Sequence, residues 1–375
     1  MLKGIHLSLM IGPAVPVPVS RTVLDALTEV EVRVAAGERS GFKLVFNLSN
    51  QSPLQTAFLL TAGNLPPVMR VVLVATVNGA TEVLIDGVIS RHSIAPGRDA
   101  GHSLLTLMGH DLTLLMDLID FSGIPYPAMP PEARVALCIA KYAAFGIVPM
   151  VIPSVLIDVP IPTEQIPRHQ GTDLKYITDL ADEVGYVFYL EPGPQPGMSL
   201  GYWGPEIKVG APQPALTVDM DMHTNCDGIT FNFDSQSKSL PVVLIQNQAT
   251  KVPIPIPIPD ITPLNPPLGL IKPLPSRLEP VNGTAKYSPV RAAIIGLTKA
   301  AKSADTVTGS GSVDVLRYGR LLKARRLVGV RGVGLAFDGL YYVKSVTHSI
   351  KPGSYTQNFE LTRNGLVSTL PTVPV

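Results

Sequence analysis

Hydrophobic and polar positions alternate with a period of two over much of the first third of the chain, as half-buried strands require. The segment FKLVF at 42–46 places its two phenylalanines and the leucine on one face. Residues 71–77 read as a second strand, and Asn78-Gly79 after them favours a tight hairpin turn before a return strand at 82–90. These spacings predict a small antiparallel barrel or sandwich in about the first 120 residues.

The pattern changes to a helical period in the middle of the chain. A helical stretch is expected at 110–119, with its apolar face formed by Leu112, Leu115, Met116 and Ile119. A second helix begins at Pro131 and reaches about residue 145. A third is capped by Thr172 or Asp173 and ends at Gly185, before strands at 186–190 and 200–203 that form a hairpin.

Strand patterns return at the end of the chain, at 326–330 and 341–350. In the second strand, strict alternation predicts one face formed by Tyr342, Lys344, Val346 and His348. A turn at 351–354 then leads into a ladder over 355–361. The two β regions, one at each end of the chain, suggest a pseudo-repeat.

Prolines gather between Pro253 and Pro280, out of 37 in the whole chain. Proline lacks the amide donor, so this segment is expected to be neither a central strand nor a helix interior. We expect an extended, semi-rigid arm. The arm is either a linker or a segment that lies on a neighbouring subunit. Ile254, Ile256 and Ile258 support the second alternative, because they are more apolar than a solvent-exposed linker would be.

Charged residues make up only 16% of the 375 residues, and hydrophobic residues 46%. Such a composition suits an obligate oligomer, whose interfaces resemble a core, or a membrane protein. The best candidate span, 135–157, contains Lys141 and is interrupted by Pro149 and Pro153, so no membrane insertion is expected. The N-terminus lacks a signal-peptide cleavage pattern. The net charge of +1 predicts no bulk attraction to nucleic acid.

Catalytic motifs such as a Walker A loop, HExxH or GxSxG are absent from the sequence. The glycine-rich stretch 309–314 does not open a βαβ unit and is expected to be a flexible loop. The two cysteines, Cys138 and Cys226, form no disulfide framework, and Cys138 is expected on the apolar face of a helix, as part of the protein core. The seven histidines are scattered along the chain. We therefore predict no enzyme and no catalytic or cofactor-binding residue.

Two clusters of polar residues are candidate binding sites. Asp219, Asp221 and His223 would share one strand face and could hold a metal, but the stretch lacks the glycine and glutamate of a calcium loop. An exposed loop between strands is favoured, and no metal ligand is assigned. A second cluster is basic and could face nucleic acid; a solvated or subunit-contacting face is favoured for Arg317, Arg320, Lys323, Arg325, Arg326 and Arg331.

Three stretches together resemble one family. They are IDGVISRHSI followed by SLLTLMGHDLTLLMD (85–117), DLKYITDLADEVGYVFYL (173–190) and GLYYVKSVTHSIKPGSYTQNFELTR (339–363). In this order they are similar to the baseplate hub family of contractile phage tails and injection systems. That family includes the phage late control protein D and the hub half of the type VI secretion spike protein, VgrG.

The resemblance implies a mainly β fold with α+β insertions: two tandem antiparallel β-barrels per chain, with a homotrimer forming a pseudo-sixfold ring. The first barrel would span 1–121, an α/β insertion 122–207, and a split second barrel 208–250 and 307–375, around a proline-rich insertion with a short helix at 251–306. Such a hub would adapt a sixfold inner tube to a threefold spike on a separate chain. It would assemble in the cytoplasm with other baseplate proteins and then join the particle.

The alternatives are a carbohydrate-binding or adhesin-type β-protein of a particle surface and a hydrolase with an unrecognised site. The first class displays exposed aromatic side chains at its binding site, whereas Trp203 is the single tryptophan of this chain. The second is disfavoured by the absence of any catalytic motif and by the low charge content.

Overall fold

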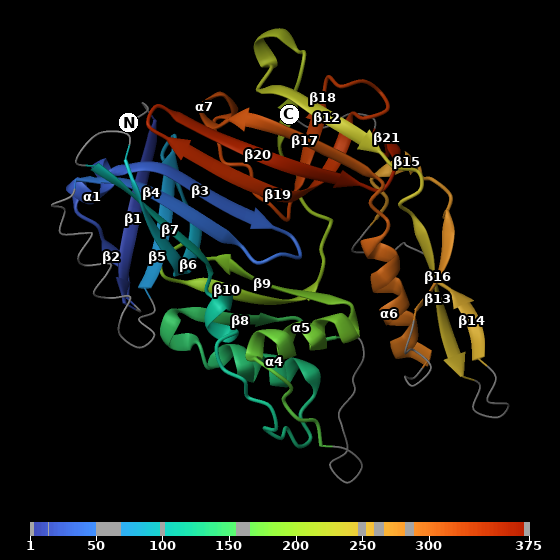
Figure 1. Cartoon of the computed structure of the whole chain (residues 1–375). Coiled ribbons are helices and arrows are strands. Elements are labelled where there is room, and N and C mark those ends of the chain that lie inside the picture. Colours follow the sequence, from blue (N-terminus) through green and yellow to red (C-terminus); the bar gives the residue numbers. More distant parts are fainter. Residues whose placement is uncertain are drawn as a thin grey trace.

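The computed structural model describes residues 4–13, 15–49, 69–97, 102–154, 166–246, 253–258, 266–281 and 289–370. Within them, antiparallel strands dominate, and a 13-stranded sheet runs across the molecule (Figure 1). The main path through this sheet is β12-β17-β20-β19-β3-β4-β7-β6-β5-β1-β2, with β18 and β11 attached beside β19.

The N-terminal half of the sheet contains the strands expected from the alternating pattern. The turn between β5 and β6 has Asn78 at φ 49° and Gly79 at φ 85°, the left-handed conformations that a two-residue hairpin requires. A short helix, α1 (Arg21–Asp25), precedes β3. The strands are β1 (Ile5–Pro13), β2 (Val17–Pro18), β3 (Leu27–Ala35), β4 (Gly41–Ser49), β5 (Met69–Val77), β6 (Ala80–Pro96) and β7 (His102–Asp111).

The C-terminal half completes the sheet around a second apolar core. The predicted turn joins β19 to β20, where Lys351 pairs with Ser354 and Gly353 has φ 83°. Two short helices, η2 (Asp221–His223) and α7 (Val315–Tyr318), lie in its connections. The strands are β11 (Gln213–Thr217), β12 (Cys226–Phe233), β17 (Val307–Asp314), β18 (Leu327–Arg331), β19 (Gly339–Lys351) and β20 (Ser354–Arg363).

The two halves are joined through the antiparallel pairing of β3 with β19, from Val30 opposite Ile350 to Ala35 opposite Ser345. Two cores lie along the sheet: the first contains Leu44 and Leu73 together with Val315 and Tyr355 of the C-terminal half, and the second contains Tyr341. Two separate closed barrels were expected. Among the described residues the strands instead follow one open path from β12 to β2, because β3 pairs with β19 on one side and β4 on the other.

An α/β unit inserted after β7 packs below this sheet (Figure 1). The predicted third helix is confirmed: Thr172 caps α5 by accepting a hydrogen bond from the Lys175 amide, and Gly185 ends it at φ 76°. Helices α4 and α5 cover a sheet of order β8-β10-β9. The elements are α4 (Pro131–Ala140), η1 (Ala143–Phe145), β8 (Ile147–Val151), α5 (Asp173–Val184), β9 (Tyr186–Pro192) and β10 (Ser199–Pro205).

The prediction of a helix over 110–119 is wrong in its length, because the helix is only four residues long. Strand β7 continues through Asp111, and the carboxylate of Asp111 then accepts the Thr113 amide at 3.0 Å to start a single turn, α3 (Thr113–Met116). Ile119 lies beyond this turn and is exposed.

Part of the proline-rich segment is an edge strand of a small sheet. Strand β14 (Pro253–Pro257) pairs with β13 (Ser239–Gln246), which also pairs with β16 (Arg277–Val281). The amides of a strand point alternately to its two sides. Prolines at every second position remove the donors on one side only, which an edge strand tolerates because that side has no neighbouring strand. Helix α6 (Pro289–Lys302) packs on this sheet through Val243, Ile258, Val281 and Ala292. Strands β15 (Gly269–Ile271) and β21 (Leu366–Ser368) pair nearby.

The glycine-rich stretch predicted as a loop is strand β17, in the interior of the sheet between β12 and β20. A Cβ at Gly309 would lie 2.7 Å from the Phe231 ring, and one at Gly311 2.8 Å from the Phe359 ring. Aromatic rings of the neighbouring strands therefore occupy the space where side chains would stand, which is why these positions are glycines.

The prediction of which side chains of β19 share a face is also wrong after Val343. Tyr341 and Val343 lie in the second core as alternation requires, but Val346 joins them there. The pairing with β20 shifts between Val343 and Ser345. The extra residue at Lys344 is a bulge, which moves the following side chains to the other face.

None of the helices in the described ranges is long and apolar enough to span a bilayer.

Candidate functional site

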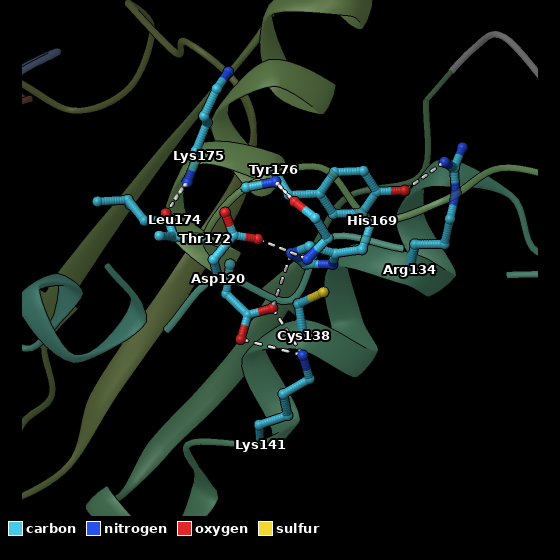
Figure 2. A network of polar contacts seen from close by, with 12 residues as sticks. Asp120, Arg134, Cys138, Lys141, His169, Thr172, Leu174, Lys175 and Tyr176 are labelled. Atoms are coloured by element: carbon cyan, nitrogen blue, oxygen red, sulfur yellow. Dashed lines mark hydrogen bonds and ion pairs between the residues drawn. The ribbon is translucent and has the colours of Figure 1, made fainter. Parts of the chain in front are cut away.

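Buried polar side chains from several segments meet where the end of α4 approaches the start of α5 (Figure 2). Asp173, in the first turn of α5, is fully buried. Its two carboxylate oxygens lie 2.8 and 3.2 Å from the Lys141 Nζ, and Tyr142 donates its hydroxyl to one of them at 2.9 Å. The carboxylate therefore keeps hydrogen-bond partners and a counter-charge although it is out of contact with water.

His169 and Cys138 lie beside this carboxylate. The Nδ1 of His169 is 3.0 Å from the Tyr126 hydroxyl, which is itself 3.6 Å from the Cys138 sulfur. The Nε2 of His169 faces Asp173 at 3.6 Å and makes no hydrogen bond among the described residues. Ligand atoms of Cys138, His169 and Asp173 all lie within 4.8 Å of one another.

The protonation of this cluster follows from its burial. Burial raises the pKa of the Cys138 thiol to about 11, although its contact with Tyr126 opposes the shift. Burial also lowers the pKa of His169, against the attraction of Asp173. At neutral pH the thiol is protonated and the imidazole is uncharged. A cysteine, a histidine and a carboxylate can form a nucleophilic triad, but Cys138 has 0% exposure and no access to a substrate.

The candidate residues from sequence lie elsewhere. Asp219, Asp221 and His223 are exposed in the connection between β11 and β12, partly in η2, and do not share a strand face. Sequence reasoning missed the buried cluster because Cys138 and His169 are far apart along the chain. The one local signal is the four-residue spacing of His169 and Asp173, which is common by chance.

Several members of the basic cluster pair with carboxylates of the same chain. Arg317 bonds Asp227, and the Nζ of Lys323 lies 2.5 Å from the Glu82 carboxylate. These contacts neutralise charge that a nucleic-acid surface would need to present.

A cavity of about 400 Å³ lies where the β9–β10 hairpin meets the C-terminal half of the sheet. Arg325 is one of the residues that line this cavity, and its φ of 62° is an uncommon conformation for a residue with a side chain. Its guanidinium lies 4.1 Å from the centre of the Tyr189 ring and donates to the Ala35 carbonyl at 2.9 Å. One residue of the C-terminal half thus contacts the N-terminal half and the inserted unit.

No protein-family model and no curated protein matches this sequence. Solved structures with the same fold do exist. A tail protein from Neisseria meningitidis MC58 has a TM-score of 0.62 at 15% identity, over 97% of this chain and 98% of that one. The 43 kDa tail protein of prophage MuSo2 from Shewanella oneidensis has a TM-score of 0.64 at 12% identity, over 96% and 98%.

The chain is also similar to a chain of the Francisella PdpA–VgrG complex, with a TM-score of 0.59 at 9% identity, over 99% of this chain and 60% of that one. The fold of this chain is thus the fold of phage tail proteins and of a chain in the PdpA–VgrG complex. At this level the predicted resemblance agrees with the structure.

Proposed function

We propose that this chain is the baseplate hub of a phage tail or contractile injection system, a structural subunit that catalyses no reaction. The observation that carries the proposal is the end-to-end match in fold to a tail protein, over 97% of this chain and 98% of its counterpart. A match of this extent includes the inserted units as well as the sheet, so it concerns the whole subunit.

The architecture supports such a role. Two β regions share one sheet through β3 and β19, and Tyr355 of the second region packs in the core of the first, so the two regions form one continuous unit. In a trimer, two β regions per chain would present six similar units around the axis, so that a threefold assembly could match a sixfold tube. We assign these regions to 1–121 and to 208–250 with 307–375, with insertions at 122–207 and 251–306. Strand β13, although it lies within 208–250, pairs with β14 and β16 of the second insertion.

The partners in this proposal are the inner tube on one face, a separate spike chain on the other, and further baseplate proteins around them. A low charge content of 16% suits a subunit that is largely covered in the assembly. The proposed location is the cytoplasm during assembly and then the particle.

The alternative, a carbohydrate-binding protein, has less support. Sugar sites present aromatic faces to solvent, whereas Trp203 is fully buried and donates its indole N–H to the Ile177 carbonyl at 3.3 Å. The ring lies against Tyr186 with centroids 4.9 Å apart. Trp203 is therefore part of the core of the inserted unit.

The mass of the purified chain tests the proposal. Light scattering across a range of concentrations should give a trimer of about 120 kDa, three times the 40.0 kDa of one chain. A chain that stays monomeric or dimeric at every concentration would argue against a self-assembling hub.

A further inference from the structure

We propose that Cys138, His169 and Asp173 form a buried binding site for one zinc ion. The site would join the end of α4, the loop before α5 and the first turn of α5. This inference does not depend on the proposed hub function, because it concerns the interior of the inserted unit.

The geometry is close to what zinc requires. The three ligand atoms lie within 4.8 Å of one another. Zinc holds sulfur at about 2.3 Å and nitrogen or oxygen at about 2.0 Å, so one sulfur and two nitrogen or oxygen ligands in a tetrahedral site lie roughly 3.3 to 3.5 Å apart. A pair at the 4.8 Å limit would have to approach by about 1.3 Å, or roughly 0.7 Å for each side chain. A water would fill the fourth position.

An independent observation comes from His169, which is 1% exposed while its Nε2 has no hydrogen-bond partner among the described residues. Buried polar atoms without partners are uncommon and unfavourable. The other ring nitrogen, Nδ1, is held by the Tyr126 hydroxyl at 3.0 Å. A hydrogen bond at one nitrogen that orients the other is the usual arrangement for a metal-binding histidine.

Charge also balances in the bound state. Without metal, the Lys141 ammonium neutralises the Asp173 carboxylate. On binding, the Cys138 thiol releases its proton to solvent, and Zn²⁺ is then neutralised by one thiolate and one carboxylate. Lys141, whose side chain is 31% exposed, is free to turn toward water. The thiolate ligand favours zinc over magnesium or calcium.

Cobalt(II) titration of the full, untagged chain after chelator treatment tests the site. Cobalt should bind one equivalent and produce a thiolate-to-cobalt charge-transfer band, which one equivalent of zinc then removes. The chain has only two cysteines, so Cys226→Ala must retain the band if Cys138 is the ligand. Cys138→Ala should lose the band, and His169→Gln should weaken cobalt binding at least tenfold.

Lys141→Met provides a second readout, because it removes the competitor for Asp173: cobalt should bind this variant more tightly than the wild type. Absence of the band in the wild-type chain would overturn the proposal. Loss of the band in Cys226→Ala would do so as well, even if the Cys138 variant fails to fold.

Discussion

The Lys141–Asp173 ion pair gives a quantitative test of how the inserted unit is held together. Asp173 is fully buried, while the Lys141 side chain keeps 31% of its exposure. Lys141→Met would leave a buried carboxylate with no counter-ion, and removal of one partner of a buried pair costs about 3 to 5 kcal/mol. Because Lys141 is partly exposed, we expect a loss of about 3 kcal/mol in the free energy of unfolding.

Asp173→Asn should cost less, about 2 kcal/mol, because the lysine left without its partner can reach water. The measurement is urea unfolding in the presence of chelator, at one fixed protein concentration, followed by circular dichroism. The matched control lies on the same helix: Lys175 and Asp179 form an ion pair with side chains 61% and 48% exposed. Lys175→Met should change stability by less than about 0.5 kcal/mol.

The reasoning would be refuted if Lys141→Met and Lys175→Met had equal effects, because burial would then make no difference. It would also fail if Asp173→Asn were clearly the more damaging change at this site, since the desolvated carboxylate is taken to be the expensive partner.

Three further predictions concern the sheet and the core. Burial lowers the pKa of His348 to about 4. As the pH falls from 7 to 4, His348 is protonated in the unfolded chain before it is protonated in the folded one, so the free energy of unfolding should drop by about 3 kcal/mol. His348→Gln should remove this contribution to the pH dependence of stability, measured by urea unfolding. A Cβ at Gly109 would lie 2.2 Å from the Val88 carbonyl oxygen, so Gly109→Ala should cost about 3 kcal/mol, whereas Gly228→Ala, with nothing within 4 Å, should stay within about 1 kcal/mol in the same assay. Trp203 fluorescence should be blue-shifted and unchanged by sugars; a red-shifted, sugar-sensitive emission would favour the carbohydrate-binding alternative.

Elements with local signals could be predicted from the sequence. Helix α5 follows from Thr172 as its cap, an apolar stripe and Gly185 as its end. The β5–β6 hairpin follows from Asn78-Gly79, because few other residues adopt two successive left-handed conformations. In these cases the residues that determine the element lie within it.

Features that depend on distant contacts could not be predicted. Strand β17 has weak strand propensity at Gly309 and Gly311, and only the rings of Phe231 and Phe359 explain the glycines. The bulge at Lys344 moves the residues after it to the opposite face from the one that regular alternation predicts.

The same limit applies to the candidate site. Cys138 was predicted to be an ordinary core residue, and it is buried. Its neighbours His169 and Asp173 come from a different segment, and their approach depends on how α4 packs against α5. The sequence contains each residue type but not the contact between them.

The symmetry of the assembled chain tests the central claim most directly. End-on class averages of the purified protein by electron microscopy would show how many similar lobes surround its axis. The hub proposal predicts a ring of three chains with six similar lobes, because each chain contributes two β regions. A ring with any other symmetry, or particles with no ring at concentrations where light scattering finds a trimer, would contradict it.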